Sequence, residues 1–206
     1  LDYVMNAPAA ASIRANWIIY IYGALTPNGL YAGTRRANIR WTGDPNRQWA
    51  GTMLPEINAV KAAILSDLGL ATGGRFDVML SWHGWPESTG KPLAWIPPQD
   101  GVPAEWTPTV AAYIGALRTR FSSPAWVPSL SEHLTTDIWW ARDRGAQFAA
   151  NVEIAQRGST ALSNYQEIAE NWAKAMQDVD AQGLFWEDDG SVTRGVRVQL
   201  HDGSTP

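Results

Sequence analysis

Phe76-Asp-Val-Met-Leu-Ser-Trp82, followed at once by His83-Gly84, is the stretch of this 206-residue chain that most constrains its fold. The run is too short for a helix and rich in apolar residues, which is typical of a buried strand. Trp17-Ile-Ile-Tyr-Ile-Tyr22 has the same character, and residues 148–154 predict a third strand. Three such strands, separated by helical and loop segments, indicate an α/β sheet.

Helical patterns lie between these strands. We expect the end of a helix over residues 1–13 with a break at Pro8, and helices over 55–65, 110–121 and 161–179. The second has Pro55 in its first turn, and the last is amphipathic. The sequence therefore predicts an α/β fold with a mixed, mostly parallel central sheet and helices on both faces.

Composition limits the class of protein. Hydrophobic residues make up 45% and charged residues 17%, as in a globular chain, and the absence of Cys excludes disulfides, thiolate zinc sites and cysteine nucleophiles. A net charge of -4 argues against nucleic-acid binding by the whole chain. No apolar run is long enough to predict a membrane span, and the compartment stays open. Twelve Trp residues favour core packing or, alternatively, a sugar-stacking surface.

Residues 30–54 have little periodicity and form a long loop, of the kind that is often functional. The loop contains Arg35, Arg36, Arg40 and the pair Asn46-Arg47. An Arg guanidinium is a planar fork that suits a carboxylate or a phosphate. The alternative is a solvated basic loop.

Two further residues could carry chemistry. His83 follows a strand, where ligands bind in α/β folds, but a structural histidine is the alternative, and no His-x-x-His or His-Glu-x-x-His spacing indicates a metal site. Glu153 lies inside an apolar strand, where burial raises the pKa of a carboxyl toward the range of a general base or acid. The alternative is an edge strand with Glu153 in solvent.

Several motifs occur together in one order. Thr26-Pro-Asn-Gly-Leu-Tyr-Ala-Gly-Thr-Arg-Arg36 is followed by Gly43-Asp-Pro-Asn-Arg-Gln-Trp49, then by Ser81-Trp-His-Gly84 and by Trp140-Ala-Arg-Asp-Arg-Gly145 ahead of Glu153. Over about residues 1–182 this pattern resembles the M14 zinc metallocarboxypeptidases, in their bacterial and cytosolic-type branch. The resemblance implies that family's architecture, incomplete at the N-terminus.

The resemblance also implies a zinc cofactor and a mechanism. His83 corresponds to the family's third zinc ligand, and Glu153 to the general base for the zinc-bound water and then the general acid. Arg36 corresponds to the residue that steadies the oxyanion. The first two ligands, a His-x-x-Glu pair, lie before the region that matches Leu1. Either the chain is a fragment or it is a degenerate homologue, and we expect it to be inactive on its own.

The implied substrate is a peptide or cell-wall peptide with a free C-terminal carboxylate. Asn46 and Arg47 would hold that carboxylate, and Ile138 would lie at the floor of the specificity pocket and favour an uncharged terminal residue. The family's substrate-binding tyrosine has no counterpart in residues 129–136.

The sequence thus predicts a partial catalytic domain over residues 1–186. Residues 187–206 read as a polar linker and the start of a possible C-terminal β domain, because 192–200 alternate like a strand. The first function is a zinc-dependent carboxypeptidase. The alternatives are an inactive peptide- or carboxylate-binding module that works without metal, and a carbohydrate-binding protein suggested by the Trp content.

Overall fold

The computed structural model describes residues 2–23, 44–51, 54–72, 77–84, 94–96, 108–121, 129–130, 134–155, 162–185 and 194–200. Within this part of the chain, no helix combines the length and the apolar character needed to cross a membrane. In chain order the elements are α1 (Asp2–Asn6), η1 (Pro8–Ala10), α2 (Ala11–Asn16), β1 (Trp17–Tyr22), η2 (Pro45–Arg47), α4 (Pro55–Asp67), η3 (Leu70–Thr72), β2 (Val78–Gly84), β3 (Ala94–Ile96), α5 (Pro108–Arg120), β4 (Ser129–Leu130), α6 (Asp137–Arg142), β5 (Phe148–Ala155), α7 (Leu162–Ala181) and β6 (Arg194–Leu200).

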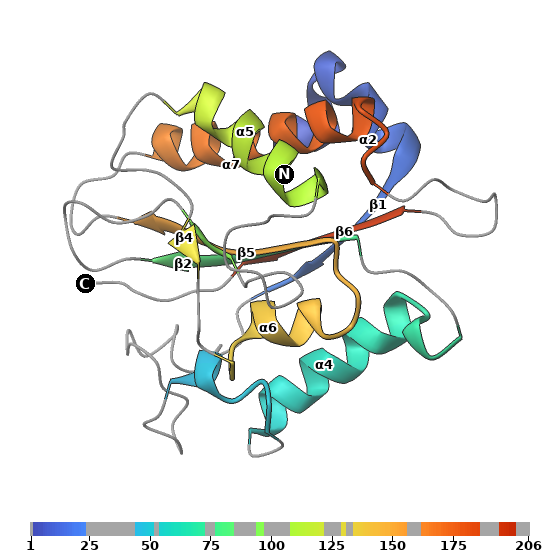
Figure 1. Ribbon diagram of the computed structural model, residues 1–206, viewed down its shortest axis with the longest axis vertical. Helices are drawn as coiled ribbons and strands as arrows, with labels where there is room; N and C mark the ends of the chain where they lie inside the picture. Colours follow the sequence, from blue (N-terminus) through green and yellow to red (C-terminus); the bar gives the residue numbers. More distant parts are fainter. Residues whose placement is uncertain are drawn as a thin grey trace.

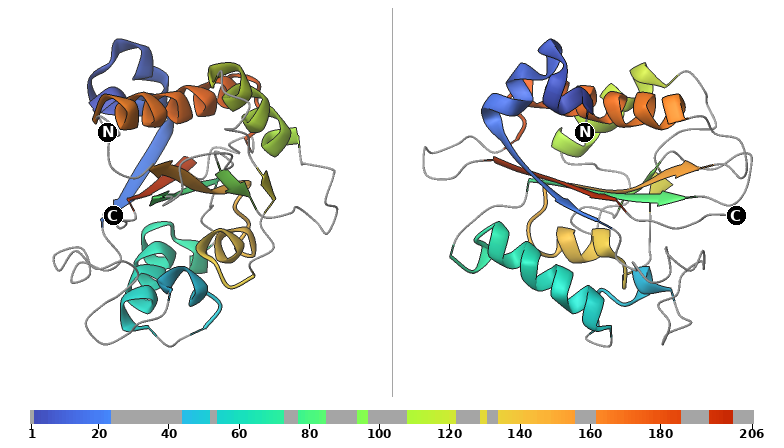
Figure 2. Two further views of the ribbon diagram at one scale, coloured as in Figure 1. Left: turned by 90° about the vertical axis from the view of Figure 1, so that its left-hand side faces the viewer. Right: turned by 180° about the vertical axis from the view of Figure 1, so that it is seen from behind.

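The strands form one six-stranded sheet in the order β1-β6-β2-β5-β3-β4. Every neighbouring pair is parallel except β3 and β5, which are antiparallel. Helices α5 and α7 lie on one face together with α1 and α2, and α4 and α6 lie on the other (Figures 1 and 2). The expected α/β fold is confirmed.

Side chains of β2 alternate between the two faces of the sheet, as in any strand. Val78, Leu80 and Trp82 belong to the hydrophobic core under α5 and α7. Met79 belongs to a second core, which contains side chains of α4 and α6. Strand β5 repeats this pattern, since Phe148 lies in the first core and Ala149 in the second. The continuous apolar run therefore reflects a strand that is covered on both faces.

The larger core is closed by α5 and α7. Helix α5 buries Val110, Tyr113, Ile114 and Leu117, which recur at the spacing of one helical face. The Tyr113 ring stacks on a sheet residue, with ring centroids 4.1 Å apart, and its hydroxyl donates to a backbone carbonyl of α7 at 2.9 Å. These contacts fix the helix pair against the sheet.

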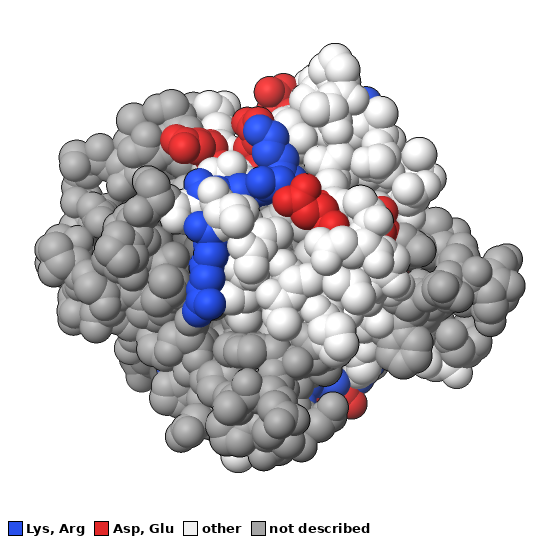
Figure 3. Space-filling model, turned by 45° about the horizontal axis from the view of Figure 1, so that its top comes forward, with Lys and Arg blue, Asp and Glu red and all other residues white. Residues whose placement is uncertain are grey.

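Charged side chains gather on the outer surface of this helix pair (Figure 3). Arg120 pairs with Asp178, and Lys174 pairs with Glu170 one turn away. Both pairs are partly exposed, and surface ion pairs contribute at most about 1 kcal/mol each. This face therefore offers surface positions for control substitutions that are remote from the site described below.

Strand β6 lies where the sequence pattern predicted the start of a further β domain. It pairs in parallel with β1 on one side and with β2 on the other, so residues 194–200 belong to the same sheet as these two strands. The expectation of a separate unit at this strand is corrected on that point. The alternating pattern predicted a strand correctly but contains no information on which strands it pairs with. Whether a further domain follows stays a prediction.

Candidate active site

The candidate site begins at the carboxyl ends of β2 and β5. Alternation places Ser81 and His83 on the same face as Met79, and Asn151 and Glu153 on the same face as Ala149. The register pairs Ser81 with Asn151 and His83 with Glu153. A shift in the register follows directly after His83. The imidazole and the carboxyl thus come from adjacent strands on the α4 and α6 face.

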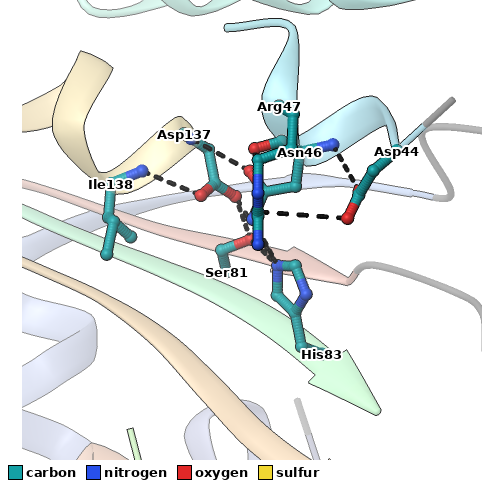
Figure 4. A network of polar contacts seen from close by, with 7 residues as sticks. All are labelled: Asp44, Asn46, Arg47, Ser81, His83, Asp137 and Ile138. Atoms are coloured by element: carbon teal, nitrogen blue, oxygen red, sulfur yellow. Dashed lines mark hydrogen bonds and ion pairs between the residues drawn. The ribbon is translucent and has the colours of Figure 1, made fainter. Parts of the chain in front are cut away.

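The short helix η2 brings a third element to this edge. The carboxylate of Asp44 accepts the backbone N–H of Asn46 at 3.0 Å and caps the turn. The Asn46 side chain is 3% exposed, and its amide is bonded at both ends. Its Oδ1 accepts the backbone N–H of Asp137 at 3.0 Å, and its Nδ2 lies 3.2 Å from Nε2 of His83 (Figure 4). Asn46 therefore joins η2, α6 and β2.

The fourth contribution is Asp137, the first residue of α6. It is fully buried, its Oδ1 accepts the backbone N–H of Ile138 at 2.8 Å, and its Oδ2 accepts the hydroxyl of Ser81. The same Oδ2 lies 3.8 Å from Nε2 of His83. Neither Asp137 nor Ser81 is among the site residues expected from the sequence. The available signal was a carboxyl at the start of a Trp-rich apolar run, which resembles an ordinary helix start.

Glu153 has a strongly perturbed proton affinity. It is 7% exposed, and its Oε2 accepts no hydrogen bond from the residues that the structure describes. Burial raises the pKa of Glu153 from 4.5 to about 7, and Asp137 acts in the same direction, while His83 and Arg47 oppose it. A carboxyl that is half protonated near neutral pH can both accept and donate a proton there.

The pKa of His83 shifts by competing causes. Burial alone lowers it, but the hydrogen bond and charge of Asp137, together with the charges of Glu153 and Asp44, outweigh burial and raise the pKa above 6.5. The side chain is 17% exposed. The imidazole therefore lies among negatively charged carboxylates, and such a site also favours a bound cation.

Arg47 lies at the rim of the site. Its side chain is 40% exposed, and its Nη1 lies 3.3 Å from the backbone oxygen of Asn46 and 4.0 Å from a carboxylate oxygen of Asp44. Its charge also lowers the pKa of Glu153, so the guanidinium acts on the buried carboxyl. An accessible guanidinium beside a buried carboxyl can bind an anionic group of a ligand.

Four of the expected site residues thus meet at one sheet edge, namely Asn46, Arg47, His83 and Glu153. Ile138 is the second residue of α6, next to Asp137, but its side chain is fully buried in the core under α4 and α6. Its place at the floor of a pocket stays a prediction. Arg36, expected to steady an oxyanion, lies outside the described residues.

The donor set for a metal is incomplete in this part of the chain. Among the described residues, no group of three or more His, Cys, Asp or Glu side chains is arranged to hold a metal ion. A catalytic zinc takes about three protein ligands. His83 can therefore be one ligand, but the described residues do not fit zinc by themselves.

Comparison with known proteins gives a likeness in structure only. No family model matches the chain, and no curated protein matches it. The fold is similar to the crystal structure of a metallo-carboxypeptidase from Burkholderia cenocepacia, with a TM-score of 0.53 and 18% identity over 77% of this chain and 43% of that chain. The tripeptide-bound cell shape determinant Csd4 protein from Helicobacter pylori gives a TM-score of 0.48 and 14% identity over 82% of this chain and 53% of that chain.

The chain therefore spans 43% and 53% of the two solved chains it is compared with. At 18% identity, the first likeness supports a fold that a metallo-carboxypeptidase also uses.

Proposed function

We propose that the protein is a hydrolase of the metallocarboxypeptidase type, which cleaves the C-terminal residue from a peptide. The proposal rests above all on Glu153, a buried carboxyl with a pKa near 7 at the carboxyl end of a strand. An M14-like fold and the sequence motifs support the same interpretation. The charges of His83, Asp137 and Arg47, from three elements that are distant in the sequence, all act on the pKa of this carboxyl. Such convergence at the carboxyl end of a strand is typical of an active site in an α/β fold.

Glu153 would act as a general base and then as a general acid. In the ionised form its carboxylate takes a proton from the attacking water, and in the protonated form it returns this proton to the leaving amine nitrogen. The pKa near 7 keeps both forms accessible at neutral pH. General acid–base catalysis of this kind contributes about 10²- to 10⁴-fold to a rate.

Zinc would require ligands in addition to those described here. Bound by His83 and by groups outside the described residues, it would supply Lewis acidity and lower the pKa of a bound water. The chain's own residues would then position the ring of His83 and move the proton at Glu153.

The substrate class follows from the rim of the site. The exposed guanidinium of Arg47 suits a terminal carboxylate, and Asn46 next to it is already bonded to His83 and to α6. In the proposal, Arg47 makes the main contact with the free C-terminus of a peptide or cell-wall peptide. Arg36 and Ile138 keep their expected roles at the oxyanion and the terminal side chain.

The experiment uses the full-length protein, because this chain is expected to be inactive on its own. It compares two peptides that differ only at the C-terminus, one with a free carboxylate and one amidated. Mass spectrometry follows loss of the terminal residue in the presence of zinc. The proposal predicts cleavage of the free acid and at least about 10-fold slower cleavage of the amide, because the amide lacks the charge that a guanidinium binds. Equal cleavage of both peptides, or cleavage of neither, would contradict it.

A second function is favoured by the incomplete metal set among the described residues. The chain would then be an inactive module that binds a peptide carboxylate with Arg47 and without metal. Calorimetry in the presence of a chelator separates the two functions. Binding of the free-acid peptide with no hydrolysis at any zinc concentration would support the module and remove the enzyme.

A further inference from the structure

Three polar groups converge on one nitrogen of His83. The hydroxyl oxygen of Ser81 and Nδ2 of Asn46 each lie 3.2 Å from Nε2, and Oδ2 of Asp137 lies 3.8 Å from it (Figure 4). A neutral imidazole has one nitrogen that donates and one that accepts. The protons on these neighbours therefore determine which form of the ring fits.

Ser81 has a single hydroxyl hydrogen, and it is already used. The hydroxyl donates to Oδ2 of Asp137, a carboxylate that is fully buried. Only lone pairs of the Ser81 oxygen remain to face Nε2 of His83. The contact at 3.2 Å is a hydrogen bond only if Nε2 carries a proton and donates it to Ser81.

Asn46 favours the opposite form of the ring. Its Oδ1 is fixed by the backbone N–H of Asp137, so its Nδ2 must face His83 and would donate to an unprotonated Nε2. This single amide dipole competes with a full carboxylate charge at 3.8 Å and with the lone pairs of Ser81. In a buried setting the charge has the larger effect, and it favours a proton on Nε2.

We propose that Ser81 and Asp137 are positioning residues that hold His83 in the form protonated at Nε2. The hydrogen bonds run in one direction, from Nε2 of His83 to the Ser81 hydroxyl and on to the Asp137 carboxylate. The lone pair of the neutral ring is then on Nδ1, the form in which Nδ1 can bind a metal ion or accept a proton. The role of Nδ1 in binding a metal ion or accepting a proton rests on the proposed function, whereas the position of the proton on Nε2 does not.

The arrangement also ties the ring to a helix. Asp137 receives the hydroxyl of Ser81 through one oxygen and the backbone N–H of Ile138 through the other, at 2.8 Å. The first turn of α6 and the orientation of the His83 ring are therefore set by the same carboxylate. A displacement of α6 would move the ring, although the two lie on different elements.

The test measures the protonated ring nitrogen directly. The protein is labelled with ¹⁵N at its three histidines, and long-range proton–nitrogen correlation spectra are recorded at alkaline pH, where the rings are neutral. His83→Gln assigns the His83 signals by their loss. The proposal predicts a protonated Nε2 and an unprotonated Nδ1 at His83. A protonated Nδ1 in the wild-type protein would overturn it without any further variant.

Two substitutions at Ser81 then separate positioning from packing. Ser81→Ala removes the hydroxyl, and the proposal predicts that His83 loses its fixed Nε2–H form, whereas Ser81→Thr retains the hydroxyl and restores it. Ser66→Ala, on an exposed position at the end of α4, is the control for an alanine substitution. An unchanged Nε2–H signal in Ser81→Ala would contradict the proposal. The spectra do not depend on hydrolysis, so failure of this inference and failure of the proposed function are separate outcomes.

Discussion

Replacing Glu153 by Gln tests whether this carboxyl has a raised pKa, through the pH dependence of the free energy of unfolding. The side chain is 7% exposed, and its pKa rises from 4.5 to about 7 because of burial. A group with a raised pKa in the folded state stabilises the fold fully below the unfolded value, and this contribution is lost as the pH rises through the folded value. The free energy of unfolding of the wild-type protein should therefore fall as the pH rises from about 4.5 through about 7. The Glu153→Gln variant has no carboxyl at this position, so it should not show this fall.

The magnitude follows from the shift. One pKa unit is worth about 1.4 kcal/mol, so the rise from 4.5 to about 7 costs the folded state about 3 kcal/mol once the carboxyl is ionised. Part of this cost is present at about pH 5, so about 2 to 3 kcal/mol should remain to be lost between about pH 5 and about pH 8. The free energy of unfolding of Glu153→Gln, relative to wild type, should rise by that amount.

The assay is urea unfolding of both proteins at the two pH values. Glu167→Gln, on the exposed side of α7, controls for removal of one carboxyl and should show no such change. His83 lowers the pKa of Glu153, so replacing His83 by Gln should raise that pKa further. In a His83→Gln background the pH-dependent difference in unfolding free energy caused by Glu153→Gln should therefore be larger. A change of less than about 1 kcal/mol in the first comparison, which is under one pKa unit, would refute the buried, neutral carboxyl.

Two further predictions concern the rim and the core. Arg47→Ala should weaken binding of a free-acid peptide by about 10-fold or more, since a charged hydrogen bond contributes about 1.5–3 kcal/mol. Arg118→Ala, at an exposed position of α5, should leave the binding unchanged. Calorimetry measures both, and equal affinities would count against carboxylate recognition by Arg47. Trp172→Ala should lower the free energy of unfolding by roughly 3–5 kcal/mol, because this ring is fully buried. Trp139→Ala should lower it by less, because that ring is only partly buried. Denaturant unfolding measures both, and a similar loss for the two variants would contradict the core described here.

Local pattern was enough for the elements that are long or strongly apolar. β1 has the predicted bounds, and β5 extends the predicted strand by one residue to Ala155. Helix α7 follows from its amphipathic spacing. The break at Pro8 is also present, because a proline begins a new helical turn more readily than it continues one.

Pairing and polar partners could not be predicted in the same way. The strand pattern of residues 194–200 is local, whereas its place between β1 and β2 is set by contacts across the whole sheet. His83 and Glu153 were identified because each ends or interrupts an apolar run. Asp137 was not, since its role depends on Ser81 and Asn46, which are distant in the sequence and meet it only in the fold.

The most direct test of the proposed function is the rate at which the full-length protein, supplied with zinc, releases the terminal residue of a free-acid peptide. The rate is measured for wild type, Glu153→Gln and the control Glu167→Gln. The account predicts a loss of at least about 100-fold in Glu153→Gln, with peptide binding retained, and a wild-type rate in the control. Wild-type hydrolysis by Glu153→Gln would show that Glu153 does not move the proton, and the proposed mechanism would have to be abandoned.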